Sequence, residues 1–100
     1  MSGIVPGTRI DLIFESDYHR GNFRLLSAVV YEVSGRKITL SQTSQPLMPH
    51  HRGQSVMVTY CTRDTGQVER YGFSAKVSDL ISDYQIDSLR RSTALVLERK

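Results

Sequence analysis

The sequence predicts an all-β fold, a small antiparallel β-barrel of five to seven strands with little or no helix. Apolar and polar residues alternate along most of the 100-residue chain, as they do on half-buried strands. The segments between the alternating stretches are short enough for hairpins, which join antiparallel neighbours. A chain of this length forms one domain, here residues 1–100, and closure into a barrel removes the exposed edges of an open sheet.

The first two predicted strands cover residues 8–14 and 23–33. The first strand has one apolar face, formed by Ile10, Leu12 and Phe14. The second strand has apolar residues on both faces, so we expect its middle to be covered from both sides. One face carries Phe23, Leu25, Val29, Tyr31 and Val33, with the rings of Phe23 and Tyr31 predicted to point inward, and the other face carries Leu26, Ala28 and Val30.

A tight turn at Ser34-Gly35, where glycine tolerates a positive φ, leads into a third predicted strand over residues 36–43. The following segment, residues 44–53, contains two prolines and is not expected to form a central strand.

The second half of the chain contains predicted strands over residues 54–62, 68–77 and 93–98, with a turn at residues 63–66. Residues 79–89 fit either one helical turn or a short strand. The inward residues of the first two of these strands are predicted to be Val56, Val58, Tyr60, Tyr71, Phe73, Ala75 and Val77.

The composition is that of an ordinary globular protein, with 39% hydrophobic and 23% charged residues. No apolar run approaches the ~20 residues of a membrane helix, and the first residues lack the features of a signal peptide. The single cysteine, Cys61, excludes an internal disulfide framework. We therefore expect a cytoplasmic protein with no membrane partner.

The positive charge is concentrated at one end of the chain. There are 13 lysines and arginines against 10 acidic residues, a formal net charge of +3. Residues 1–87 hold nine of each, so the whole excess lies in residues 88–100. A cluster at one end favours nucleic-acid binding less than an evenly basic face does. The basic residues of the cluster are Arg90, Arg91, Arg99 and Lys100.

Nothing in the sequence indicates an enzyme or a metal site. There is no nucleophile motif of the Gly-x-Ser-x-Gly type, and the glycines do not form a phosphate-binding loop. The soft metal ligands are His19, His50, His51 and Cys61. The two adjacent histidines point to opposite sides in an extended chain, whereas a structural zinc needs four converging ligands.

Two alternative functions involve other ligands. Small barrels that bind RNA or single-stranded DNA stack bases on exposed aromatic rings, but here only Tyr18 and Tyr84 lie outside the clearly predicted strands. Nucleic-acid binding is therefore the second hypothesis. A flavin-binding split barrel ranks third, because the sequence has no phosphate-binding strand–turn pattern for it.

Two local patches lie within this order of strands: the turn Ser41-Gln-Thr-Ser-Gln-Pro-Leu47 and the strand segment Arg70-Tyr-Gly-Phe73. With these patches, residues 7–98 resemble the N-terminal domain of flagellar-brake-type PilZ proteins. The resemblance implies a split β-barrel, similar in shape to flavin-binding split barrels. It also implies a role in cyclic di-GMP signalling.

In that family a following PilZ domain binds most of the dinucleotide, through an Arg-x-x-x-Arg junction and a later Asp/Asn-x-Ser-x-x-Gly strand. The second motif is absent from this chain. The only Arg-x-x-x-Arg joins Arg20 and Arg24, before the second strand rather than after the last, and we interpret it as coincidence. The PilZ domain itself is thus expected to be absent from this chain, which alone would bind cyclic di-GMP weakly or not at all.

The resemblance implies a non-catalytic accessory domain that transmits nucleotide binding to domain orientation or to a protein partner. Its expected partners are a C-terminal PilZ domain and a flagellar-motor or other protein, with a homodimer as a further option. The candidate site residues are Arg90, Arg91, Arg99 and Lys100. Arg99 and Lys100 would enter the junction, whereas Arg90 and Arg91 would lie in the turn before the last strand, facing the ligand, a partner or solvent.

Overall fold

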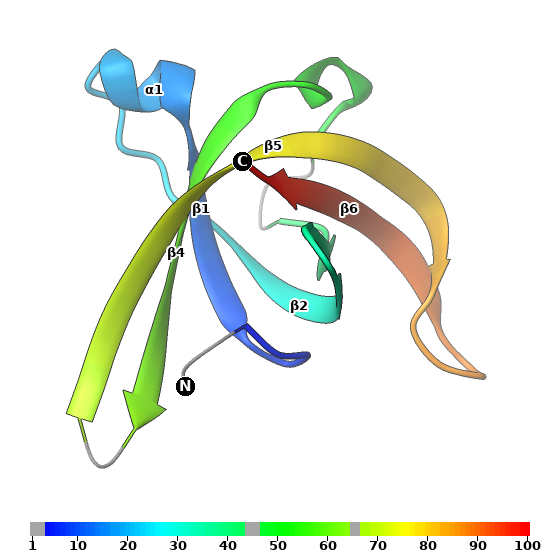
Figure 1. Cartoon of the computed structure of the whole chain (residues 1–100). Coiled ribbons are helices and arrows are strands. Elements are labelled where there is room, and N and C mark those ends of the chain that lie inside the picture. The colour runs from blue at the N-terminus through cyan, green and yellow to red at the C-terminus, as the bar shows by residue number, and fades with distance from the viewer. Residues whose placement is uncertain (1–3, 44–46, 65–66) are drawn as a thin grey trace.

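The computed structural model describes residues 4–43, 47–64 and 67–100, with the side chains of residues 62–69 left out. Six antiparallel strands close into a barrel in the order β1-β2-β3-β6-β5-β4, and β4 pairs back onto β1 (Figure 1). The predicted small antiparallel barrel is confirmed. Its elements are β1 (Arg9–Phe14), α1 (Glu15–His19), β2 (Leu26–Ser34), β3 (Lys37–Ser41), β4 (Ser55–Asp64), β5 (Gln67–Gln85) and β6 (Arg91–Arg99).

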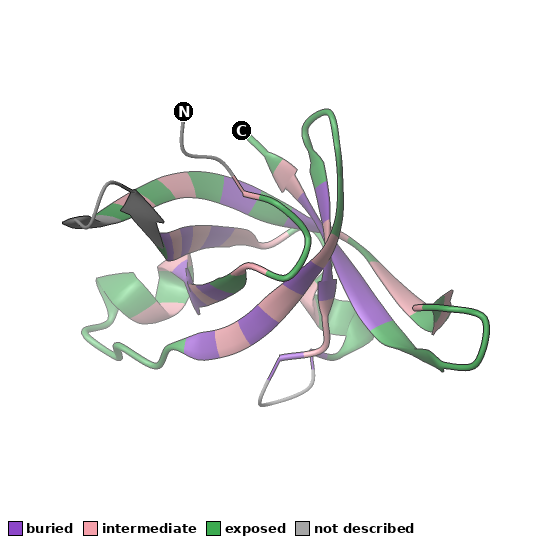
Figure 2. Cartoon of the chain, turned by 90° about the horizontal axis from the view of Figure 1, so that it is seen from below, coloured by how far each residue is buried: buried purple, intermediate pink, exposed green. Residues whose placement is uncertain are grey.

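The core fills the inside of the barrel with apolar side chains from all six strands. Buried and half-buried residues alternate along β2 from Leu26 to Tyr31 and along β4 from Ser55 to Tyr60, and Figure 2 shows the alternation in β2 as purple and pink bands. The predicted inward faces of β1 and β4 are confirmed, and Ala75 and Val77 of β5 are buried as predicted. Residues with no measurable exposure are Ile10, Leu12, Leu40, Val56, Val58, Ala75, Ala94, Leu95 and Leu97.

The prediction that Phe23 and Tyr31 point inward from the second strand is wrong. Phe23 and Leu25 precede β2 and are 65% and 54% exposed. The register explains the difference, because Leu26 lies opposite Leu12, which is fully buried, and opposite residues share a face of the sheet. The inward residues are therefore Leu26, Ala28 and Val30. Tyr31, and Val29 and Val33 on the same face, are half-buried or exposed.

The ambiguous segment after Val77 is neither a helical turn nor a separate strand. It continues β5, a single strand of 19 residues. Two register shifts against β6, between Val77 and Asp79 and between Ile81 and Tyr84, interrupt the ladder without ending it. The first part of β5 pairs with β4 and the later part with β6, so this one strand joins the two sides of the barrel.

Two short helical turns occur outside the strands. The single turn of α1 follows β1 directly, has Glu15 and Asp17 near its N-terminus, and is followed by Gly21 at φ 78. A 3₁₀ turn at Pro49–His51 agrees with the prediction that this region is not a strand. The turn predicted at Ser34-Gly35 is present but shifted by one residue: Gly35, at φ 60, and Arg36 form it, whereas Ser34 ends β2 and pairs with Lys37. Residues 44–46 and 65–66, parts of other predicted loops, lie outside the described residues.

Candidate functional site

The four candidate cations do not form one site. β6 begins at Arg91 and ends at Arg99, so Arg90 alone precedes the strand, which corrects the predicted turn position of Arg91. The nine residues of β6 span about 26 Å at the usual rise of an extended strand. The charge that is clustered in the sequence is therefore divided between opposite ends of one strand.

At the first end, Arg90 and Arg91 are paired with acidic neighbours. Arg90 Nε lies 2.8 Å from Asp87 Oδ2, and Arg91 Nη1 lies 2.7 Å from Asp83 Oδ2. The backbone N–H of Leu89 and the Arg90 guanidinium lower the pKa of Asp87, which favours its charged form. This end of β6 is a largely neutralised hairpin turn on the surface.

At the other end, Arg99 and Lys100 contact residues from distant parts of the chain. The Arg99 guanidinium lies 4.2 Å above the ring of Phe73, and the Arg99 carbonyl accepts hydrogen bonds from the Arg36 side chain. Lys100 Nζ donates to Ser55 Oγ and lies 4.0 Å from Glu15 Oε1. The end of β6 is thus held against β5, β4 and α1.

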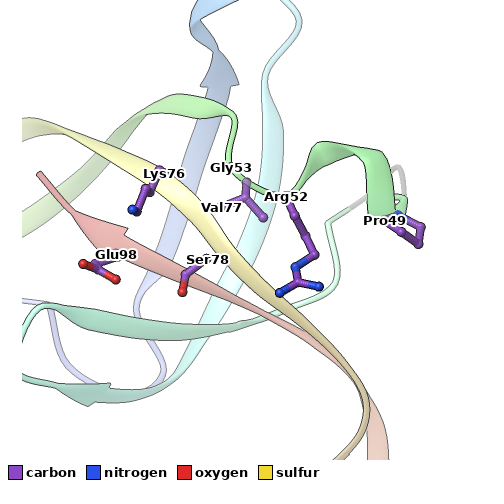
Figure 3. Close-up of a pocket in the computed structure, with 7 residues that line it drawn as sticks. All are labelled: Pro49, Arg52, Gly53, Lys76, Val77, Ser78 and Glu98. Carbon is purple, nitrogen blue, oxygen red and sulfur yellow. The ribbon is translucent and has the colours of Figure 1, made fainter.

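A polar cleft of about 510 Å³ borders this end of β6. Lys76 and Glu98 come from neighbouring strands, and Arg52 reaches in from the segment before β4 (Figure 3). Arg52 Nη2 lies 3.9 Å from Asp79 Oδ1, which is longer than a hydrogen bond. The lining residues are Pro49, Arg52, Gly53, Lys76, Val77, Ser78 and Glu98.

A second polar cleft, of about 500 Å³, lies beside α1. Lys100 contacts two of its lining residues, so the end of β6 lies between the two clefts. Lysine, arginine and histidine side chains in both clefts suit the binding of an anion or a carboxylate. The residues that line this cleft are Glu15, Ser16, His19, Arg20, Gln54 and Ser55.

Sequence reasoning missed Arg52, Lys76 and Arg20 as members of this region. Arg20 appears in the sequence only as half of the Arg-x-x-x-Arg that we interpreted as coincidence. No local motif in the sequence marks Arg52 or Lys76 as site residues. They lie beside Glu98 only because β5 pairs with β4 on one side and with β6 on the other. A site assembled from strands that are distant in sequence has no local motif.

The third pocket is apolar and was not expected. It has a volume of about 360 Å³ on the outer side of β1 and β4, where Ile13 and Met57 form part of its lining. Tyr18 and Phe23 meet edge to face with ring centroids 5.4 Å apart, and both are exposed. The residues that line it are Ile13, Tyr18, Phe23, Leu25, Met57, Thr59 and Arg70.

One of the three histidines, His51, has a packing role. His51 Nδ1 accepts the N–H of Met48 at 2.9 Å, and its ring stacks on Phe14. Across the described residues, no three His, Cys, Asp or Glu side chains gather as a metal site would require.

The patch from Ser41 to Leu47 has a structural role. The Gln42 side-chain oxygen accepts the N–H groups of Thr43 and Leu47, at 3.2 and 3.1 Å. Leu47 is buried in the core. The Gln42 side chain thus holds the backbone of Thr43 and of the buried Leu47, which gives these residues of the pattern a structural role.

Comparisons with protein-family models, curated proteins and solved structures found no match to this chain. In the described part of the chain, no helix is long and apolar enough to cross a membrane. The resemblance to PilZ N-terminal domains therefore stays a prediction from the sequence.

Proposed function

We propose that this chain is a non-catalytic interaction domain of a cyclic di-GMP-responsive PilZ protein. In this role it contacts a neighbouring PilZ domain at the C-terminal end of β6. Nucleotide binding at the junction changes the orientation of the two domains or the surface presented to a protein partner. The proposal combines the resemblance of residues 7–98 with the arrangement around Lys100.

The supporting observation is the way in which Arg99 and Lys100 are held. Their contacts with Phe73, Ser55 and Glu15 fix the direction in which the backbone leaves the barrel. A switch between two domain arrangements needs contacts that differ between them. The polar clefts on either side of Lys100 supply charged groups for such contacts.

The guanidinium of Arg52 is the group in this region best suited to a phosphate. It is 60% exposed and lies only loosely against Asp79. A guanidinium can bind a phosphate through two parallel hydrogen bonds, which an ammonium cannot do. We therefore expect Arg52 to contribute to a nucleotide-bound arrangement, with most of the affinity supplied by the PilZ domain.

The decisive experiment joins this chain to a PilZ domain through an Arg-x-x-x-Arg linker. Cyclic di-GMP affinity is measured by calorimetry, and the change in domain distance by fluorescence energy transfer. Lys100→Glu should change the affinity about fivefold or more, the lower range of allosteric coupling, and reduce the distance change. Arg91→Glu is the matched control at the other end of β6 and should leave both unchanged.

Two results would contradict the proposal. One is a pair of variants, Lys100→Glu and Arg91→Glu, that both behave like the unmodified fusion. The other is saturation of the isolated 100-residue chain by cyclic di-GMP at low micromolar concentration, since the chain lacks the second PilZ motif.

The exposed aromatic pair supports a second candidate function, binding of RNA or single-stranded DNA. Tyr18 and Phe23 offer rings on which bases could stack, and Arg70 lines the same pocket. A short single-stranded RNA should then bind, with an affinity that falls steeply between low and physiological salt. Phe23→Ala should weaken this binding, and binding that is unaffected by Phe23→Ala and by salt would dismiss this function.

A further inference from the structure

The apolar pocket beside α1 is built on the outer face of the sheet. Its floor comes from Ile13 of β1, from Met57 opposite it on β4, and from Thr59 two residues along β4. Ile13 follows the core residue Leu12, so its side chain points away from the core. It is nevertheless only 7% exposed, because α1 contacts β1 and β4 here and Tyr18 lines the same pocket.

The rim of the pocket consists of Tyr18, Phe23 and Leu25. The rings of Tyr18 and Phe23 meet edge to face, an arrangement that holds the two rings against each other. All three side chains are between 45% and 65% exposed. Several large apolar side chains that are exposed together within a polar border are typical of an interaction surface.

The size of the pocket favours a single large apolar group. Its volume of about 360 Å³ lies near the lower end of the range, about 300–1,000 Å³, that is usual for binding pockets. A small ligand in this space would cover only the inner sides of the rim residues. A protein segment would also cover their exposed outer sides, so the exposure of the rim favours a partner protein.

The charge at the pocket favours acidic residues next to that apolar group. Arg70 is the one charged residue among the described residues that line the pocket. Its side chain is 63% exposed, and Nη2 lies 3.9 Å from Asp11 Oδ2, which is longer than a hydrogen bond. Asp11 Oδ1 accepts a hydrogen bond from the Ser27 hydroxyl. The Arg70 guanidinium can therefore bind a second carboxylate through its planar fork.

The inside of the pocket suits an apolar side chain better than a nucleobase. Apart from Arg70, the polar side chains among its described lining residues are those of Tyr18 and Thr59. The polar edges of a base would lose water there and find few partners, which is costly. A phenyl or alkyl group has no such edges.

A second copy of this chain is a poorer occupant. In a two-fold dimer each molecule presents the same surface to the other. Arg70, and Arg24 between the rim residues Phe23 and Leu25, would then approach their counterparts. Like charges that face each other across an interface oppose association.

We propose that this pocket is a docking site for a segment of a partner protein in which a large apolar side chain is followed by acidic residues. The apolar side chain fills the space between the rim and the floor, and a carboxylate pairs with Arg70. Anchors that fill a pocket in this way supply most of the energy of many interfaces. The lining residues differ from those of both polar clefts, so the inference does not depend on the proposed role in cyclic di-GMP signalling.

The test uses the intact 100-residue chain and two blocked hexapeptides that differ only in charge. One contains a phenylalanine followed by two glutamates, and the other has glutamines in place of the glutamates. Binding is followed by NMR of the methionine methyl groups. The glutamate peptide should shift the signal of Met57, which lines the pocket, and leave that of Met48, which is exposed elsewhere, unchanged.

The two parts of the peptide should contribute separately. The glutamine peptide should bind about two- to fivefold more weakly than the glutamate peptide, as expected for the loss of an exposed ion pair. A glutamate peptide with alanine in place of phenylalanine should bind at least about tenfold more weakly, because it lacks the buried apolar group. These comparisons need no variant of the protein.

Three variants examine the pocket itself. Arg70→Gln should abolish the preference for the glutamate peptide over the glutamine peptide. Leu25→Ala removes part of the rim and should weaken binding of the glutamate peptide about fivefold or more. Leu89→Ala is the matched control, since Leu89 is an exposed leucine that does not line the pocket, and it should leave binding unchanged. All three side chains are exposed, so the variants should keep the fold.

The proposal is overturned by equal binding of the glutamate and glutamine peptides, or by a Met57 signal that neither peptide shifts. A short single-stranded RNA that shifts Met57 and is not displaced by the glutamate peptide would assign the pocket to nucleic acid instead. A dimer in sedimentation that Leu25→Ala dissociates would assign it to a second copy of this chain.

Discussion

The two ends of β6 carry the same formal charge but hold it in different ways. At the first end, Arg90 and Arg91 pair with carboxylates only three and eight residues away in sequence. At the other end, Arg99 and Lys100 contact Phe73, Ser55 and Glu15, which come from three other elements. At the first end the ion pairs connect residues that are close in sequence. At the second end the contacts connect β6 and Lys100 with β5, β4 and α1. A cluster of charge in sequence therefore does not define a single site.

Within β6, the buried residues should contribute more to the free energy of unfolding than the charged residues at its ends. Leu97 is fully buried and lies between Ile38 and Val77 in the sheet. Leu97→Ala should lower the free energy of unfolding by about 2–5 kcal/mol, through lost burial and a residual cavity. Urea unfolding measures this loss.

Leu89→Ala is the matched control, because Leu89 lies in the turn before β6 and is 93% exposed. It should change the free energy of unfolding by less than about 0.5 kcal/mol. Similar losses for the two leucines would contradict the barrel packing that places Leu97 in the core.

The next effect concerns the first end of β6, where Tyr84 stacks on Tyr31 and donates a hydrogen bond of 2.9 Å to Glu32. Tyr84→Phe keeps the ring and removes the hydroxyl. It should lower the free energy of unfolding by about 1 kcal/mol or less at neutral pH, a typical net value for a partly exposed hydrogen bond. Chemical unfolding of both proteins at pH 7 gives the difference.

The same variant should alter the dependence of stability on alkaline pH. Partial burial, followed by the hydrogen bond to Glu32, raises the pKa of Tyr84 above its ordinary value of 10.0. The resulting stabilisation is complete below pH 10 and is lost as pH rises through the higher pKa of the folded state. The unmodified chain should therefore lose more stability between pH 9 and 11 than Tyr84→Phe, and equal losses would exclude this contribution.

The sequence predicts the parts of the fold whose alternation is unambiguous. In β1 and β4 only one face is strongly apolar, and that face is buried. In β2 both faces are apolar, so only the pairing of Leu26 with Leu12 decides which one is inward. The sequence also does not show that β5 is one continuous strand. Its register shifts near Asp79 and Tyr84 interrupt the period of two on which a strand prediction depends.

The candidate site was harder to predict than the fold. The sequence shows where Arg99 and Lys100 lie along the chain but not that Glu15 and Ser55 meet Lys100, since these contacts arise from closure of the barrel. These contacts are consequences of strand register, which no local pattern in this chain specifies.

A smaller difference in stability is expected between variants that remove a charge at one end of β6 or at the other. Arg99→Gln removes the guanidinium from the face of Phe73 and should cost about 0.5–1 kcal/mol of stability. Arg91→Gln, which removes only a surface ion pair, should cost less. A double-mutant cycle with Phe73→Leu isolates the ring contact, and a coupling energy near zero would show that Arg99 does not use the ring.

The smallest effect is expected at Asp87, which is exposed. The N–H of Leu89, followed by the Arg90 side chain, lowers the pKa of this carboxyl below its ordinary value of 3.8. Its stabilising contribution is therefore present above pH 3.8 and is lost as pH falls through the lower pKa of the folded state. Asp87→Asn should have a slightly lower melting temperature than the unmodified chain at pH 6, and the difference should narrow toward pH 2. A difference that is constant from pH 2 to 6 would mean that the charge of Asp87 does not stabilise this turn, although its carboxyl still accepts the N–H groups of Leu89 and Arg90.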